Sequence, residues 1–271
     1  MEALLAPDPA LEAYDGLAPH YDEFTAGYAY DRWLDALEAL ATEHGLSGRR
    51  LLDVACGTGK SFLPMVERGY QVTACDLSPG MVTRAREKAP PGEAEVLVAD
   101  MRALTVLGEF DLVTCLDDAI NYVTTPGEVR ATLEGFARNL RPGGLAVFDA
   151  NTLATYRTSF ARDAALDRDG AFFCWRGEAA ADAGPGATAS AWIEVFVDEG
   201  DGCWRRSRTR HVQRHHPRGE VERAVAAAEL ELLAVRGQAT GARIEPEPDE
   251  ERHSKVVYVV RKPSTGTRDR G

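Results

Sequence analysis

The chain has 271 residues, of which 44% are hydrophobic, and a formal net charge of −12. This length supports one large domain, or one domain that carries an insertion. The acidic balance argues against a nucleic-acid-binding protein, because neutralising phosphates requires a basic face.

The cysteine content and the N-terminus both bear on the cellular compartment. The 5 cysteines form no Cys-x-x-Cys pair, a pattern typical of small buried side chains in a reducing compartment. The first residues lack the basic start and apolar stretch of a signal peptide. No apolar run is long enough to cross a bilayer, so we expect a cytoplasmic protein without a membrane segment.

A glycine turn organises the first half of the chain. Residues 51–59, Leu-Leu-Asp-Val-Ala-Cys-Gly-Thr-Gly, read as a buried strand that turns through two glycines, and an amphipathic helix is predicted over 60–68. Glycine lets the backbone approach a ligand closely, and a helix start offers unpaired N–H groups. Asp53 precedes the turn, and Asp76 ends the next predicted strand.

The turn partly matches two other nucleotide-binding motifs, but each of them lacks a required glycine in this sequence. A P-loop requires Gly-x-x-x-x-Gly-Lys-Ser/Thr, but Val54 stands where its first glycine belongs. A dinucleotide site requires Gly-x-Gly-x-x-Gly, but Phe62 replaces its third glycine. The sequence therefore disfavours both ATP and NAD.

The segments Asp53–Gly59 and Ala74–Met81 together resemble the class I S-adenosylmethionine (SAM) dependent methyltransferases. These enzymes carry Asp/Glu-x-x-x-Gly-x-Gly after the first strand and an acidic residue at the end of the second. The resemblance implies that SAM is the cofactor and that Asp76 accepts both ribose hydroxyls. The implied cofactor residues are Tyr14, Tyr21, Asp53, Ala55, Gly57, Gly59, Asp76, Leu77, Met81, Asp100, Met101 and Leu116.

Residues 49–151 form the expected SAM-binding core. Strands are expected at 49–55, 71–76, 95–99, 110–116 and 144–150, and further helices at 79–89 and 126–140. This alternation predicts an α/β fold with a doubly wound, Rossmann-like sheet and ligands at the carboxyl ends of its strands. There Asp100 and the backbone N–H of Met101 would bind adenine, or Asp100 would only cap a helix.

Residues 1–48 are expected to form an N-terminal helical lid, with helices over 11–24 and 29–44. The segment Tyr14 to Asp22 resembles the lid that covers the cofactor in these methyltransferases. The resemblance makes Tyr21 a candidate for contacting the carboxylate end of the cofactor, with Tyr14 nearby. Simple packing of both tyrosines on the core is an equally good interpretation.

The segment after the fourth strand, Leu116 to Tyr122, is where this family places the reactive methyl group and its acceptor. The backbone of Leu116 would take the methionine amino group of SAM. Asp117, Asp118, Asn121 and Tyr122 are candidates for contacting substrate or cofactor, although one of the two aspartates could serve only as a cap.

Residues 152–216 break the alternation and predict an antiparallel β insertion, with a strand at 190–197, a turn at 198–202 and a strand at 203–213. It resembles the extension of small-molecule methyltransferases acting on amino sugars, so it would roof the acceptor pocket, with Trp175 contacting substrate. Its tryptophans could equally fill its own core or a homodimer interface.

Three histidines of this insertion, His211, His215 and His216, are candidate general bases. His211 and His215 would share one strand face and could take a proton near neutral pH. Exposed histidines at a sheet end are the alternative. No carboxylate spacing supports a metal site, so none is expected.

Residues 217–262 return to the core, with a helix at 218–229 and strands at 230–236 and 255–261, and residues 263–271 form a polar tail. The resemblance implies methyl transfer from SAM to N or O of a small-molecule acceptor, such as a sugar or secondary metabolite. A tRNA or protein methyltransferase, or an inactive SAM-binding subunit, is the alternative.

Overall fold

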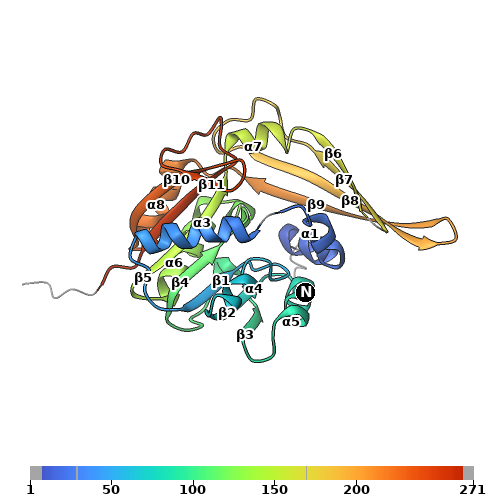
Figure 1. Ribbon diagram of the computed structural model, residues 1–271. Coiled ribbons are helices and arrows are strands. Elements are labelled where there is room, and N and C mark those ends of the chain that lie inside the picture. Colours follow the sequence, from blue (N-terminus) through green and yellow to red (C-terminus); the bar gives the residue numbers. More distant parts are fainter. Residues whose placement is uncertain (1–7, 29, 169, 265–271) are drawn as a thin grey trace, which may run out of the picture.

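The computed structural model describes residues 8–28, 30–168 and 170–264, and these residues form two β-sheets (Figure 1). The larger sheet has the strand order β11-β10-β12-β5-β4-β1-β2-β3, and the smaller one the order β6-β7-β8-β9. The strands of the larger sheet are β1 (Arg50–Val54), β2 (Gln71–Asp76), β3 (Ala94–Val98), β4 (Phe110–Cys115), β5 (Leu140–Asn151), β10 (Glu231–Ala239), β11 (Arg243–Glu245) and β12 (Lys255–Arg261). Those of the smaller sheet are β6 (Asp163–Arg168), β7 (Ala171–Gly177), β8 (Thr188–Gly200) and β9 (Cys203–Arg214).

The helices flank the larger sheet or join it to the smaller one. The α-helices are α1 (Pro9–Leu17), α2 (Tyr21–Phe24), α3 (Tyr30–Glu43), α4 (Leu63–Glu67), α5 (Pro79–Lys88), α6 (Pro126–Asn139), α7 (Leu153–Thr158) and α8 (Arg218–Ala227). The 3-10 helices are η1 (Ala18–His20), η2 (Met101–Ala103) and η3 (Ala119–Tyr122).

The larger sheet confirms the predicted doubly wound fold. Its strands β3, β2, β1, β4 and β5 run parallel, so their carboxyl ends meet along one edge. The C-terminal strand β12 then pairs antiparallel with β5, and β10 pairs antiparallel with β12. The strands β10 and β12 thus extend the sheet that β1 to β5 form.

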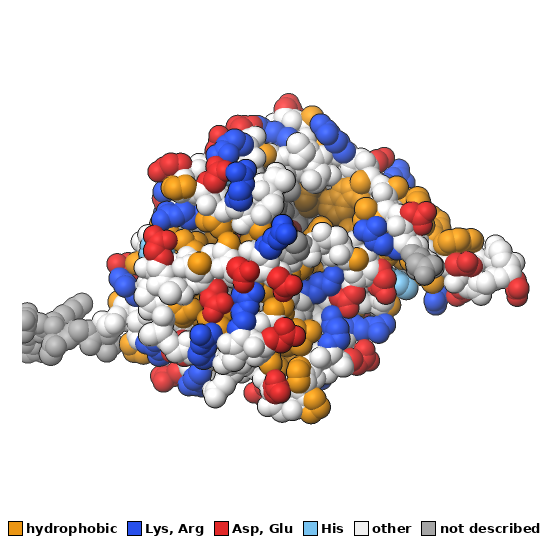
Figure 2. Space-filling model, in the orientation of Figure 1, with side chains coloured by type: hydrophobic (Ala, Val, Ile, Leu, Met, Phe, Trp, Pro, Cys, Tyr) orange, Lys and Arg blue, Asp and Glu red, His pale blue; other side chains and the backbone are white. Residues whose placement is uncertain are grey.

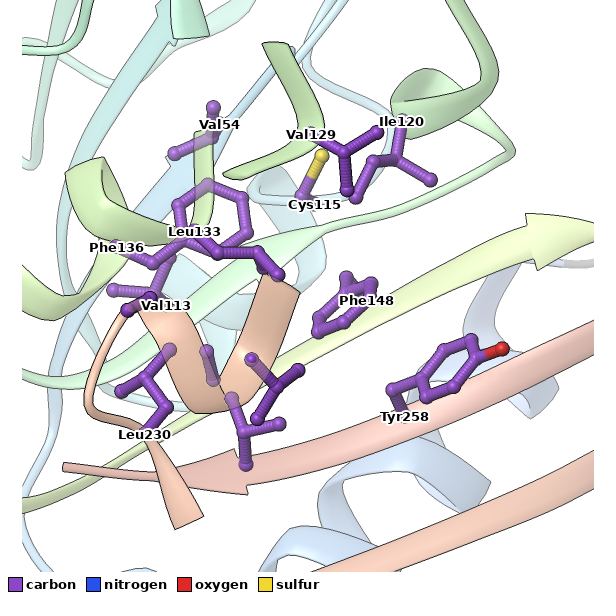
Figure 3. Packing of buried hydrophobic residues seen from close by; sticks show 14 of the residues in the cluster. Val54, Val113, Cys115, Ile120, Val129, Leu133, Phe136, Phe148, Leu230 and Tyr258 are labelled. Carbon is purple, nitrogen blue, oxygen red and sulfur yellow. The ribbon is translucent and has the colours of Figure 1, made fainter. Parts of the chain in front are cut away.

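Side-chain alternation along the strands builds a hydrophobic core on each face of this sheet. Alternate residues of a strand point to opposite faces, so Leu52 and Val54 pack with α6 and α8, whereas Leu51 packs with α3 and α4. Figure 3 shows part of the first cluster, in which the rings of Phe148 and Tyr258 stack with centroids 5.0 Å apart. Burial on both faces explains the almost continuous apolar runs of these strands.

The smaller sheet is the predicted insertion, and Figure 1 shows it extending over α1 toward the tip of the β8–β9 hairpin. Leu17 of α1 packs against its inner face together with Phe173, Ile193 and Val195. The strands β8 and β9 were predicted, but β6 and β7 were missed. Most of β6 is exposed, so its sequence carries little hydrophobic pattern, whereas the first residues of β7 alternate between buried and half-buried.

Two predicted helices differ from those in the structure. The helix expected over 60–68 begins only at Leu63, because the turn first closes with the Gly59 N–H donating to the carbonyl of Cys56. The helix expected over 11–24 is divided into α1, η1 and α2. Pro19 lies at this break, and proline removes a backbone donor that a continuous helix needs.

Candidate active site

The glycine turn and the end of β2 form one hydrogen-bonded unit. The N–H of Gly57 donates to Oδ2 of Asp76 at 2.8 Å, and the N–H of Ser78 donates to Oδ1 at 2.9 Å. Gly57 has a φ of 54° and Gly59 a φ of 96°, the region that favours glycine. Burial raises the pKa of Asp76, against the lowering effect of these two backbone donors.

A cavity, which we call the first cavity, lies above the carboxyl ends of β1 to β4. Its lining includes most of the predicted cofactor residues. These are Tyr14, Tyr21, Ala55, Gly57, Asp76, Leu77, Asp100, Met101 and Leu116. The structure therefore brings together side chains from the lid, the glycine turn and three further strand ends.

Three predicted cofactor residues do not line this cavity. Asp53 is buried behind the turn, where Ser61 and Thr114 hydroxyls donate to it at 2.5 and 2.6 Å. Burial raises the pKa of Asp53 to about 6. Gly59 faces the ring of Phe62, which a Cβ would approach to 3.0 Å, and the side chain of Met81 is fully buried in the core. These residues shape the turn and its support rather than the cavity wall.

The cap predicted for Asp100 is confirmed, whereas its contact with adenine stays a prediction. Its side chain accepts from the backbone N–H of Arg102 and so caps η2, and it also lines the first cavity. The guanidinium of Arg102 binds the same carboxylate at 2.7 Å. Asp100 is therefore held in place at the cavity wall by the next turn of chain.

The lid is fastened to the core by three aspartates spaced seven residues apart, which we call the lid latch. Asp8 pairs with Arg102 after β3 at 2.6 Å. Asp15 accepts from Ser78 Oγ and Gly80 N after β2, at 2.8 and 2.7 Å. Asp22 accepts from Thr58 Oγ1 at 2.6 Å and from Lys88 Nζ at 2.9 Å. Each latch residue thus holds a different loop of the first cavity.

Lys60 also belongs to this fastening rather than to a P-loop. Its Nζ donates to the carbonyl oxygen of Asp22 at 3.1 Å and to Thr25 Oγ1 at 2.6 Å. A P-loop lysine would instead be presented to phosphate oxygens. The geometry agrees with the missing glycine at Val54.

The loop after β4 carries two successive aspartates in the left-handed region, Asp117 with φ 60° and Asp118 with φ 53°. Both backbone N–H groups donate to Asp149, at 2.8 and 2.7 Å. The ammonium of Lys255 lies 2.6 Å from Asp117, 2.9 Å from Asp118 and 3.3 Å from Asp149. We call these four residues the Lys255 cluster.

Burial and the ammonium act in opposite directions on the carboxyl groups of this cluster. Burial raises the pKa of Asp149 to about 6 although Lys255 opposes it. The pKa of Asp118 is also raised by burial, whereas for Asp117 the charge of Lys255 and hydrogen bonds from Lys255 and Tyr30 outweigh burial and lower the pKa. Burial disfavours the charged form of Lys255, but the three carboxylates raise its pKa.

A second cavity lies between the core, the lid and the insertion. It is the larger, at about 530 Å³ against about 80 Å³ for the first. Figure 2 shows a hollow with hydrophobic side chains beneath the insertion. The residues that line both cavities are Tyr14, Tyr21, Tyr30, Asp117 and Tyr122, which we call the junction. Four of these five side chains are phenols, so the two cavities meet at an aromatic wall.

His211 is the predicted base that reaches the second cavity. Its Nδ1 lies 3.0 Å from the hydroxyl of Tyr122, and its ring packs edge-on against Tyr14 with centroids 5.3 Å apart. Burial lowers the pKa of His211 to about 4, and burial raises that of Tyr122. At neutral pH both groups are therefore uncharged.

Among the residues predicted for catalysis or for binding the acceptor, two line neither cavity. His215 lies beyond the end of β9, where Gly186 N–H donates to Nδ1 at 3.2 Å and Nε2 is 3.1 Å from Glu250. Asn121 is fully buried and joins β5 to the end of β9, since its amide accepts from Asn151 N–H and donates to the carbonyl of Arg214. The prediction that these two residues contact substrate is therefore not supported by the geometry.

Trp175 lines the second cavity as expected, and its Nε1 donates to the carbonyl of Ser159 at 2.7 Å. Sequence reasoning missed Tyr30 and Lys255, which also line it. The signal that could have found Lys255 is a lysine at the start of an otherwise apolar strand. Tyr30 had no comparable signal, because it begins an ordinary amphipathic helix.

Comparison with known proteins agrees with this geometry. Residues 51–144 match a family described as a methyltransferase domain. A Bacillus subtilis protein with the name "Putative methyltransferase YqeM" is 31% identical over 242 residues, which cover 88% of this chain and 94% of that one. The chain belongs to the SAM-dependent methyltransferases. It is an enzyme that uses SAM, and the resemblance of its glycine turn is confirmed.

Solved structures share the fold of this methyltransferase. A SAM-dependent methyltransferase from Clostridium acetobutylicum superposes with a TM-score of 0.75 at 24% identity, over 93% of this chain and 99% of that one. The sugar N-methyltransferase KedS8 from Streptoalloteichus gives a TM-score of 0.73 at 22% identity, over 96% and 97% of the two chains. The coverage includes the insertion as well as the core.

An amino-sugar relative matches over a shorter stretch of the methyltransferase. A Streptomyces fradiae protein, dTDP-3-amino-3,6-dideoxy-alpha-D-glucopyranose N,N-dimethyltransferase, is 33% identical over 123 residues, or 45% of this chain and 48% of that one.

Within residues 8–28, 30–168 and 170–264, no helix is long and apolar enough to cross a membrane. The same residues contain no group of three or more metal-ligating side chains placed to hold a metal ion.

Proposed function

We propose that the enzyme transfers the methyl group of SAM to a small-molecule acceptor, and that the acceptor atom is an amine nitrogen. The observation that carries the proposal is the junction, where two cavities share one wall. The first cavity is lined by most of the predicted cofactor residues, and the second has room for a separate molecule. A methyl donor and an acceptor in these two cavities would face each other at the junction.

The residues of the first cavity fit SAM. Each carboxylate oxygen of Asp76 accepts one hydrogen bond from a backbone N–H. A carboxylate oxygen can accept a second hydrogen bond, so the two oxygens together suit the two neighbouring hydroxyls of a ribose. Leu77 and Met101 provide apolar contacts for a base, and Asp100 provides an acceptor for its amine. Bound SAM supplies an activated methyl group, which passes to an acceptor lone pair and leaves S-adenosylhomocysteine.

The protonation states at the junction favour an amine over a hydroxyl acceptor. A hydroxyl acceptor often needs a base to remove its proton, whereas a neutral amine already presents a lone pair. His211, with a pKa lowered to about 4, is a weak base, and its Nδ1 already meets the hydroxyl of Tyr122. The phenol rings of the junction also suit the positive charge that a neutral amine nitrogen gains as it accepts the methyl group.

The relatives support the same class of acceptor. They include a sugar N-methyltransferase and an amino-sugar N,N-dimethyltransferase, although the second match spans about half of each chain. The insertion over the second cavity is shared with the first of these structures at the level of the fold. A homodimer through the insertion remains a prediction.

The first test is calorimetric titration with SAM, S-adenosylhomocysteine, ATP and NAD, of which we expect only the first two to bind. Transfer of labelled methyl is then measured on separate panels of amino sugars, other small amines, sugar alcohols, unmodified tRNA and peptides. Turnover with small amines alone supports the proposal. Transfer only to hydroxyls would overturn the choice of nitrogen, and transfer only to tRNA or peptides would overturn the small-molecule acceptor. SAM binding without turnover on any panel would favour the inactive binding subunit.

A further inference from the structure

Lys255 is the residue at which the C-terminal strand β12 reaches the site. It begins this strand, pairs in register with Asn151 of β5, and lines the second cavity. Its ammonium is buried and contacts three carboxylates, one for each hydrogen that an ammonium can donate. It also lies 5.2 Å from the centre of the Trp33 ring, so an aromatic face covers the remaining side.

The loop that Lys255 contacts is strained and needs support. The left-handed region is strained for a residue other than glycine, and Asp117 and Asp118 both adopt it. Their carboxylates are also neighbours of the same charge, and the carboxylate of Asp149 lies beside them. Without a cation among them, repulsion would add to the backbone strain and favour a different loop conformation.

The remaining contacts of the two aspartates connect this loop to the lid and the insertion. Asp117 accepts from the hydroxyl of Tyr30 at 2.7 Å, and Asp118 accepts from the amide of Gln213. The loop therefore meets α3 on one side and β9 on the other. Because Asp117 belongs to the junction and lines both cavities, its position helps to set the boundary between them.

We propose that Lys255 is a positioning residue for methyl transfer, which holds the Asp117–Asp118 loop as the wall where the acceptor meets the cofactor. This inference rests on the proposed function only for its effect on turnover. The ammonium does not itself accept a proton or a methyl group. It keeps two adjacent carboxylates in one arrangement, and so keeps the acceptor aligned through the residues that it orders.

The test compares Lys255→Met and Lys255→Gln with Lys255→Arg, which retains the charge. Lys262→Met is the matched control, because Lys262 follows the same strand and donates to the carbonyl of Leu140, away from both cavities. Hydrogen exchange followed by mass spectrometry needs no acceptor. We expect exchange of residues 116–122 to become at least tenfold faster in the Met variant, with residues 51–59 unchanged and the Arg variant within threefold of wild type.

Other exchange patterns would overturn the proposal. A general structural role would accelerate exchange throughout the sheet, and unchanged exchange at 116–122 in a folded Met variant would show that the loop does not need the ammonium. If the Met variant does not fold, Lys255→Gln carries the same test, since its amide keeps donors for the aspartates without the charge.

Turnover gives the second readout, using the most active amine of the panel. We expect kcat of Lys255→Met to fall at least tenfold, while the Kd for S-adenosylhomocysteine stays within threefold. A kcat within threefold of wild type would overturn the positioning role. If no panel member is methylated, the proposed function fails, but the exchange result still decides whether Lys255 orders the loop.

Discussion

Replacing Asp76 with alanine tests the central assignment of the cofactor site. We expect Asp76→Ala to weaken S-adenosylhomocysteine binding, because the carboxylate is the acceptor assigned to the ribose hydroxyls. A hydrogen bond to a charged group contributes about 1.5–3 kcal/mol. That range corresponds to a rise in Kd of about 10- to 150-fold.

The same change lowers stability, and the structure indicates by how much. Asp76 accepts from two backbone N–H groups, of Gly57 and Ser78, and alanine would leave both without this acceptor. Each unsatisfied buried donor costs about 1–3 kcal/mol. The total approaches the smaller values of a typical free energy of unfolding, about 5–15 kcal/mol. Calorimetric titration should therefore be run well below the midpoint of thermal unfolding.

Asp111→Ala provides the matched control. Like Asp76, Asp111 accepts from a backbone N–H, that of Arg50 at 2.9 Å. It differs in pairing with Arg141 and in lying at the opposite end of the sheet. We expect this variant to lose stability and to keep its affinity for S-adenosylhomocysteine. Equal affinity of wild type and a folded Asp76→Ala variant would refute the ribose assignment.

Two further predictions concern His211 and the lid latch. The pKa of His211 is lowered from 6.5 to about 4, so the unfolded chain binds a proton on this imidazole at a higher pH than the folded chain does. The contribution of His211 to the free energy of unfolding is therefore present above pH 6.5 and is lost as the pH falls through about 4. Denaturant titrations should therefore show the stability difference between wild type and His211→Gln changing by about 3 kcal/mol between pH 7 and pH 4; parallel curves would contradict the lowered pKa. Asp15→Ala removes the acceptor of Ser78 and Gly80, and we expect stopped-flow release of S-adenosylhomocysteine to accelerate about fivefold, from a loss of about 1 kcal/mol. The exposed Asp31→Ala serves as its control, and equal release rates of the Asp15 and Asp31 variants would show that the lid does not limit release.

The sequence allowed the fold and much of the first cavity to be predicted because both depend on local patterns. Apolar runs, glycines and strand-end carboxylates lie close together in the chain, and parallel strands bring their ends to one edge. Asp76, Gly57 and Asp100 were predicted on this basis, and the structure places them in one cavity.

The second cavity could not be predicted in the same way, because long-range contacts build it. Lys255 lies 138 residues after Asp117, and Tyr30 lies 87 residues before it. Nothing in their local sequence indicates that they converge on one carboxylate. His215 was misplaced for a related reason, since strand alternation ends at Arg214 and the chain turns away from the cavity.

The lid latch has a consequence for the order of events in turnover. Tyr14 and Tyr21, which the latched segment carries, line both cavities. If SAM and the acceptor occupy the two cavities as proposed, the segment cannot uncover the cofactor without also opening the cavity of the acceptor. S-adenosylhomocysteine and the methylated product would then leave in the same opening of this segment. A partly methylated molecule would dissociate before the next SAM binds. Repeated methylation of one acceptor would then be distributive, with intermediates appearing in solution between successive transfers.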